Sequence, residues 1–233
     1  MSTVQETTTL NKIRSRGYWR VVIRPTAFQE HHLPRYDDLF RIVERNSVQL
    51  RGWDYPHIDR SGARLHGSDW VGQESEWEDK IEVFRIYQSG LFTHFFAIAG
   101  DWRNQSKVWR PAEPGWAWGR EIYYLNTIYS FVEIFKFAAR LALSPAGASH
   151  MIVEIDMEKL AGRRVTTRDS DIAMFAEYRT EAPKWNYRWE GIQTDLIATP
   201  RELAAKASQH FFARFGLVLS LETMSRLQQR MAR

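Results

Sequence analysis

The sequence predicts an α+β fold, in which a mostly antiparallel sheet packs against a long central apolar helix and further helices follow at the C-terminus. Three observations support this class. Segments rich in β-branched and aromatic residues recur along the chain, as strands do. Residues 120–143 form one long segment whose apolar residues cover nearly the whole helical circumference, which indicates a helix buried on several sides. Residues 199–231 carry the start and stop signals of helices.

The N-terminal part of the chain supplies one strand and one helix. Residues 1–16 are expected to form a flexible N-terminal segment, and residues 17–233 a single α+β domain. Residues 18–24 (YWRVVIR) are typical of a strand, which Pro25 ends. Residues 35–46 (RYDDLFRIVERN) place apolar residues at helical spacing with charges opposite, and they predict a surface helix.

The middle of the chain predicts a hairpin, a loop and the central helix. Residues 80–99 are expected to form two strands that meet at Ser89-Gly90, a pair that suits a turn. Residues 101–119 form a loop that holds four tryptophans, and loops of this length are usually functional or packed down. The helix of residues 120–143 ends before Pro145.

The C-terminal part predicts two more strands and two helices. Residues 150–155 (HMIVEI) and 184–192 (KWNYRWEGI) are strand-like, and the aromatic face of the second is expected to cover the core. Thr199 and Glu202 have the spacing of a capping box, which predicts the start of a helix. Residues 221–231 predict a final amphipathic helix.

The composition excludes several classes of protein. The chain of 233 residues holds no cysteine, which rules out disulfides, thiolate nucleophiles and cysteine-rich zinc sites. It has neither common kind of phosphate-binding glycine loop, so we expect no ATP hydrolysis, no dinucleotide chemistry and no cofactor. Residues 1–9 carry no apolar signal segment, and charges interrupt residues 122–143, the longest apolar stretch. We therefore expect a cytoplasmic protein without a membrane span.

Ten tryptophans and a net charge of +4 favour recognition of an aromatic or anionic partner. Average usage would give about three tryptophans in a chain of this length. The indole ring is flat and rigid, and it suits stacking platforms as well as protein cores. A nucleic acid or a nucleotide is therefore a candidate partner, although a charge of this size permits an anionic partner without requiring one.

The segment RGWDYPHI, residues 51–58, is the densest local signal for a ligand site. Its guanidinium could hold a phosphate while its rings stack on a base, which predicts ligand-binding roles for Arg51, Trp53, Tyr55 and His57. Three arginines later in the sequence would add phosphate contacts, namely Arg163, Arg164 and Arg188. The structural alternative is a loop that its aromatic residues plug into the core.

A metal-dependent nuclease or phosphodiesterase is the alternative function, and it would use Asp54, His57, Glu154 and Asp156. Glu154 and Asp156 alternate along one predicted strand and so face the same side. No histidine pair with metal-ligand spacing occurs, and the leading hypothesis includes no metal. Residues 78–80 (EDK) hold an acid-x-lysine spacing that some nucleases use, but a charged start of a strand explains it more simply.

Three charged residues interrupt the apolar central helix. Glu133, Lys136 and Arg140 share one side of it. Charges in such a helix are costly unless they are paired or hydrated. They form either the polar floor of a pocket or a salt-bridged stripe that meets solvent, and the sequence favours neither.

A set of segments carries a resemblance to a known domain. The segments are GYWRVVIRP (17–25), LRGWDYPHI (50–58), FRIYQSGLF (84–92), FVEIFKFAARLA (131–142), and TPRELA with FARFG near the C-terminus. They resemble a poorly characterised bacterial domain of the C-terminal region of Schlafen/AlbA-type proteins, which are classed as nucleic-acid-binding or ATP-binding. The resemblance spans residues 17–216 and leaves no N-terminal segment long enough for the AlbA-type module. It implies a stand-alone accessory or sensing domain of a regulatory or phage-defence system.

The leading hypothesis is a non-catalytic bacterial binding or sensing protein that recognises nucleic acid, a nucleotide or a partner protein. The metal-dependent nuclease is the first alternative. A structural subunit, whose exposed aromatic residues are buried against another chain, is the second.

Overall fold

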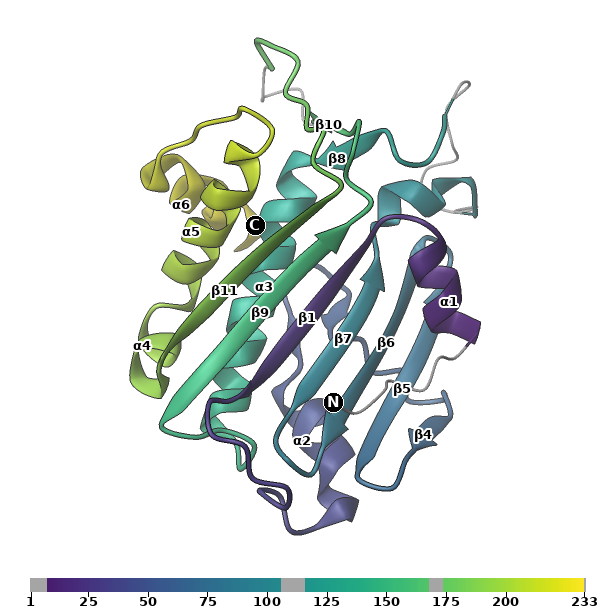
Figure 1. Cartoon of the computed structure of the whole chain (residues 1–233), viewed down its shortest axis with the longest axis vertical. Coiled ribbons are helices and arrows are strands. Elements are labelled where there is room, and N and C mark those ends of the chain that lie inside the picture. Colours follow the sequence, from purple (N-terminus) through teal and green to yellow (C-terminus); the bar gives the residue numbers. More distant parts are fainter. Residues whose placement is uncertain (1–7, 106–115, 168–173, 233) are drawn as a thin grey trace.

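The computed structural model describes residues 8–105, 116–167 and 174–232. Over these residues, seven strands form one antiparallel sheet in the order β11-β9-β1-β7-β6-β5-β4 (Figure 1). The predicted α+β class is confirmed. The strands of this sheet are β1 (Tyr18–Pro25), β4 (Arg64–His66), β5 (Trp70–Trp77), β6 (Lys80–Tyr87), β7 (Phe92–Ala97), β9 (His150–Glu158) and β11 (Lys184–Ile192).

The long helix α3 (Tyr124–Leu143) crosses one face of the sheet, and the C-terminal helices pack beside it (Figure 1). Phe131 of α3 joins the layers, because its ring lies 5.0 Å from that of Trp19 and 5.5 Å from that of Trp185 on the sheet. It also lies 5.9 Å from the ring of Phe211 in the next helical layer. The other helices of this side are α2 (Leu39–Asn46), α4 (Gln193–Ala198), α5 (Pro200–Ala213) and α6 (Leu221–Gln229).

The central helix begins at Tyr124 and not at residue 120 as predicted. The residues before it form strand β8 (Glu121–Tyr123), which pairs in parallel with β10 (Arg164–Thr166). The pairing of β8 with β10 leaves no pattern in neighbouring residues, because the two strands are far apart in the sequence. The helical periodicity therefore continues through residues 121–123, and the sequence predicts a helix there.

The N-terminal segment is helical where it is described. Residues 8–15 form helix α1 (Thr8–Ser15), so the prediction of a flexible segment over residues 1–16 is wrong for them. Leu10 and Ile13 are fully buried against β6 and β7, on the face of the sheet opposite α3 (Figure 1). Residues 1–7 lie outside the described residues. A helix this short is marginal by itself, and its tertiary contact stabilises it.

Helix α5 starts without the predicted capping box. Pro200 occupies the first position as expected, but the Thr199 side chain caps nothing in α5. Its hydroxyl donates instead to the carbonyl oxygen of Asp195 at 3.0 Å. Because α4 ends at Ala198, Thr199 closes that helix while it precedes the next one.

The other predicted elements are confirmed with small shifts at their ends. β6 and β7 pair across a turn that contains Gly90, whose φ is +78°. Trp185 on β11 is 3 % exposed and faces the core, as predicted for that strand. The short strands β2 (Val48–Gln49) and β3 (Asp54–Tyr55) pair with each other, and β3 lies within the loop segment of residues 51–58. The helical turns are η1 (Tyr36–Asp38), η2 (Ala99–Gln105) and η3 (Arg230–Ala232).

A buried ion pair between Arg163 and Asp101 links the start of β10 to the start of β1. Arg163 is fully buried, and its Nη1 donates to Oδ1 of Asp101 at 2.8 Å while Nη2 bonds to Oδ2. Asp101 also accepts the backbone N–H groups of Gly17 and Gly119, each at 2.9 Å. The prediction that Arg163 contacts a phosphate is therefore wrong, because its guanidinium is buried and already bonded.

Replacing Arg163 by Met is expected to leave the Asp101 carboxylate buried without its counter-charge. Losing one partner of a buried pair lowers the free energy of unfolding by about 3–5 kcal/mol. The control is Arg188→Met, because Arg188 pairs with Glu154 and Glu190 on an exposed part of the sheet and such pairs contribute little. Urea denaturation followed by circular dichroism measures both variants. Equal stability of the two would contradict this role of Arg163.

Candidate functional site

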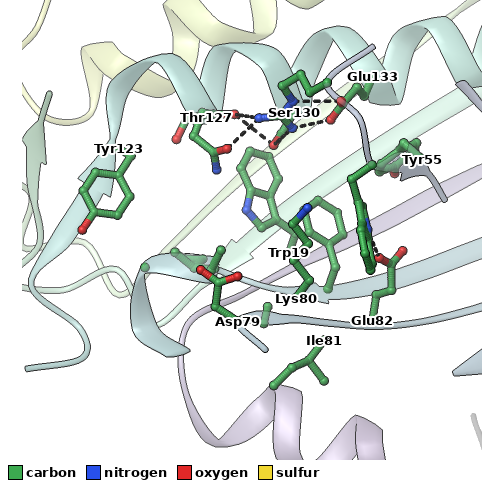
Figure 2. Close-up of a pocket in the computed structure, with 18 of the residues that line it drawn as sticks. Trp19, Tyr55, Asp79, Lys80, Ile81, Glu82, Tyr123, Thr127, Ser130 and Glu133 are labelled. Carbon is green, nitrogen blue, oxygen red and sulfur yellow. Dashed lines mark hydrogen bonds and ion pairs between the residues drawn. The ribbon is translucent and has the colours of Figure 1, made fainter. Parts of the chain in front are cut away.

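A cavity of about 290 Å³ lies between α3 and the sheet, beside the loop of residues 51–58 (Figure 2). Its walls come from β1, β3, β6, β7, β8, β9, η2 and the first half of α3. The indole of Trp19 stands at its centre in Figure 2. Arg51, Trp53 and Tyr55 line the cavity, so the structure brings three of the four predicted loop residues to one concave site.

The buried carboxylate of Glu82 on β6 anchors the loop to the sheet. It accepts a hydrogen bond from Trp53 Nε1 at 2.9 Å and another from the backbone N–H of His57 at 3.0 Å. His94 on β7 adds a third, from its Nε2 at 2.9 Å. Burial by itself would raise the pKa of Glu82, but the bonds from His94 and Trp53 outweigh burial and lower it. Glu82 therefore stays charged and fixes the loop.

Trp53 lies between charged neighbours at the edge of the cavity. The His57 ring stacks on it with centroids 3.7 Å apart, and Lys80 Nζ lies 4.1 Å from its ring centroid. His57 Nδ1 bonds to Asp54 Oδ1. Although burial opposes both charges, this bond lowers the pKa of Asp54 and raises that of His57. His57 therefore supports Trp53 and does not line the cavity itself.

Arg51 closes one side of the cavity through an ion pair with α3. Its Nε donates to Glu133 Oε1 at 2.9 Å, and its Nη2 bonds to the second carboxylate oxygen. Its Nη1 donates to Asn126 Oδ1 at 2.6 Å. The sequence left open whether the charges of the central helix line a pocket or form a stripe that meets solvent. Glu133 lines the cavity, whereas Lys136 and Arg140 do not. The charge of Arg51 is balanced within the protein.

Asp79 and Lys80 face the cavity from the end of the β5–β6 hairpin (Figure 2). They form no ion pair with each other or with any other residue that the structure describes. Burial raises the pKa of Asp79 and lowers that of Lys80. Both shifts mean that the surroundings disfavour the charged form, so each group gains from a bound partner.

Two buried polar atoms beside the cavity also lack partners within the described part of the chain. They are the Tyr55 hydroxyl and His94 Nδ1. Their rings pack edge to face with centroids 5.0 Å apart. Burial, followed by the charges of Glu82 and Glu133, raises the pKa of Tyr55 well above its usual value, so its hydroxyl stays neutral. Unpaired buried polar groups are uncommon and mark this end of the cavity as a place where a ligand could bond.

The remaining predicted arginines lie elsewhere. Arg188 projects from the sheet face opposite α3, where Glu154 and Glu190 bind its guanidinium. Arg164 is exposed and lies 3.5 Å from a Glu121 carboxylate oxygen. Neither lines the cavity, so the predicted set of loop and arginines does not form one surface.

The structure does not bring the alternative catalytic residues together. Asp54 and His57 lie on the α3 side, whereas Glu154 and Asp156 lie on the other face of the sheet. Asp156 accepts a bond from Arg20, its neighbour on β1. No group of three or more potential metal ligands occurs in residues 8–105, 116–167 and 174–232. The nuclease site predicted from these four residues is therefore wrong.

The tryptophans have several different roles. Trp102 is buried, with the Arg16 guanidinium 4.1 Å from its ring centroid. Trp118, in the same predicted loop, is 49 % exposed, and Trp77 on β5 is 57 % exposed. Trp109 lies outside the described residues. Only part of the excess of tryptophan therefore contributes to the cavity.

Glu82 and Trp19 shape the cavity but carry no sequence signal beyond the pattern of the strands that hold them, and the same holds for His94. Asp79 and Lys80 belong to the segment EDK, for which the sequence favours a charged start of a strand. The burial of the charged Glu82 could be inferred only from the tertiary structure, in which β6 pairs with β7 and contacts the loop of residues 51–58.

Comparisons with protein-family models, with curated proteins and with solved structures found no match for this chain. The resemblance to the Schlafen/AlbA-type domain stays a prediction. Among the described helices, none has the length and hydropathy needed to cross a bilayer.

His57 provides a test of the loop through its protonation. Its raised pKa means that the pair with Asp54 adds stability that is fully present below about pH 6.5, the unfolded value, and is lost as the pH rises through the folded value. An NMR titration of the imidazole should give a midpoint above 6.5. Asp54→Asn should lower the midpoint, because burial is then the main influence. A smaller fall is expected for Asp59→Asn, and an unchanged midpoint in Asp54→Asn would contradict the assignment.

Proposed function

We propose that this chain is a binding or sensing protein whose cavity takes a small planar heterocycle, such as a nucleobase or a nucleoside. One observation carries the proposal. The aromatic side chains of Trp19 and Trp53 line the same cavity as Asp79 and Lys80, which form no ion pair with any residue in the described part of the chain. Concave sites with apolar walls and a few convergent polar groups are typical of small-molecule binding.

The size of the cavity supports a small ligand. Pockets for small molecules typically occupy roughly 300–1,000 Å³. The volume here, about 290 Å³, lies just below that range. A single ring system with a substituent suits this space, whereas a nucleic-acid strand would need an open groove along its backbone.

The charge distribution also favours a small heterocycle over a nucleic-acid strand. A strand is held mainly by cations that are free to replace its counterions. Glu133 already binds Arg51, two glutamates bind Arg188, and Arg163 is buried with Asp101. We therefore propose recognition of a base-like molecule within the cavity.

The test is tryptophan fluorescence and calorimetry on the full chain with purine and pyrimidine nucleosides. An aromatic contact with a ligand ring contributes about 0.5–1.5 kcal/mol, so Trp53→Leu, which removes part of the cavity lining, should weaken binding by roughly 2- to 13-fold. Because Trp53 also bonds to Glu82, a second variant, Ala99→Leu, should weaken binding by filling the cavity without touching that bond.

Trp118→Leu is the control, since Trp118 is half-exposed and does not line the cavity. It should bind as the wild type does. The proposal fails if no nucleoside binds, or if the three variants bind equally well. Salt-dependent binding of oligonucleotides that survives Ala99→Leu would instead indicate a surface site for a strand.

A further inference from the structure

We propose that the cavity selects heterocycles that carry a 2-amino-4-oxopyrimidine edge, as guanine and the pterins do, through Asp79 and Lys80. This inference rests on the proposed function, because it names the ligand class of the same cavity. Three observations support it. Both side chains line the cavity. One can only accept hydrogen bonds in its charged form and the other can only donate them. Neither forms an ion pair with another residue that the structure describes.

The β5–β6 hairpin brings these two consecutive residues to the cavity. Trp77 pairs with Lys80 across the hairpin, so Glu78 and Asp79 form its turn. Glu78 has a φ of +53°, in the left-handed region that residues other than glycine and asparagine rarely adopt. Such a conformation persists where the surrounding structure holds it, and it often occurs at functional sites. The turn and the first residue of β6 thus place the Asp79 carboxylate and the Lys80 ammonium group at the cavity (Figure 2).

The two groups require complementary partners on the ligand. A carboxylate only accepts hydrogen bonds, and its two oxygens match two parallel N–H donors. An ammonium group only donates, so it matches an oxygen or an unprotonated ring nitrogen. A ligand that satisfies both must present two donors followed by an acceptor along one edge.

The 2-amino-4-oxopyrimidine edge has this order. Its 2-amino group and ring N–H would donate to Asp79, and its oxo group would accept from Lys80. Adenine places an unprotonated ring nitrogen beside its amino group, and uracil flanks its N–H with two oxygens. In either case an acceptor would face the carboxylate of Asp79, which leaves a buried charge without its partner and costs affinity.

The aromatic walls and the surrounding charges fit the same ligand. Trp19, Trp53 and Phe96 give the cavity an aromatic lining, which suits a flat bicyclic system. A cationic ligand would meet Lys80, and an anionic one would meet Asp79, so a neutral ligand with a polar edge is favoured. Arg51 and Glu133 are paired and need no charge from the ligand.

Isothermal titration calorimetry on the full chain tests the inference with guanosine, pterin, inosine and adenosine. Inosine lacks the 2-amino group, so it loses one hydrogen bond to a charged acceptor. Guanosine should bind more tightly than inosine by about 10- to 100-fold, and adenosine should bind most weakly. Asp79→Asn should reduce the guanosine–inosine ratio to near one. Asp69→Asn is the matched control, since Asp69 does not line the cavity, and it should keep the ratio.

Lys80→Met and Lys80→Gln test the oxo contact. Lys80→Met should weaken guanosine by about tenfold, and Lys80→Gln, which keeps an N–H donor, should weaken it less. If pterin binds tightly and guanosine does not, the result would support recognition of the same edge and identify a pterin as the ligand class. Tryptophan-dependent binding of all nucleosides with equal affinity would overturn this inference and leave the proposed function standing. No binding by any of the four probes would overturn both.

Discussion

The candidate site depends on the buried carboxylate of Glu82. A lone charge in this position would be costly, and three donors, from Trp53, His57 and His94, compensate it. Two of these donors belong to the loop of residues 51–58, and the third belongs to the neighbouring strand. The hydrogen bonds that compensate the buried charge of Glu82 also hold the loop in place. Through them, this wall of the cavity is attached to the sheet.

The charged residues that line the cavity include two contrasting pairs. Arg51 and Glu133 compensate each other and connect the loop to α3. Asp79 and Lys80 are brought to the same space by the hairpin, and neither forms an ion pair with another described residue. The first pair closes a wall, and the second leaves an acceptor and a donor facing the space. The proposed recognition groups are therefore residues that form no ion pair among the described residues.

Much of the fold could be predicted because strand and helix periodicities are local. The strand of residues 184–192 was predicted with its final limits, and the loop of residues 51–58 was identified as a ligand-site candidate from composition alone. The start of α3 was wrong because β8 depends on a distant parallel partner, β10. Helix α1 was missed because only two apolar side chains mark it, and their burial depends on β6 and β7.

By itself, the sequence determined the types of most elements, the α+β class and the loop at which the cavity forms, since these follow from spacing along a few consecutive residues. Only the tertiary structure decided which charged groups are available to a ligand. Arg51 meets Glu133 across 82 positions and Arg163 meets Asp101 across 62, so no local pattern reveals that either guanidinium is already bound. Pairing between distant residues is a property of the packed chain, and it separates structural charges from those that can recognise a ligand.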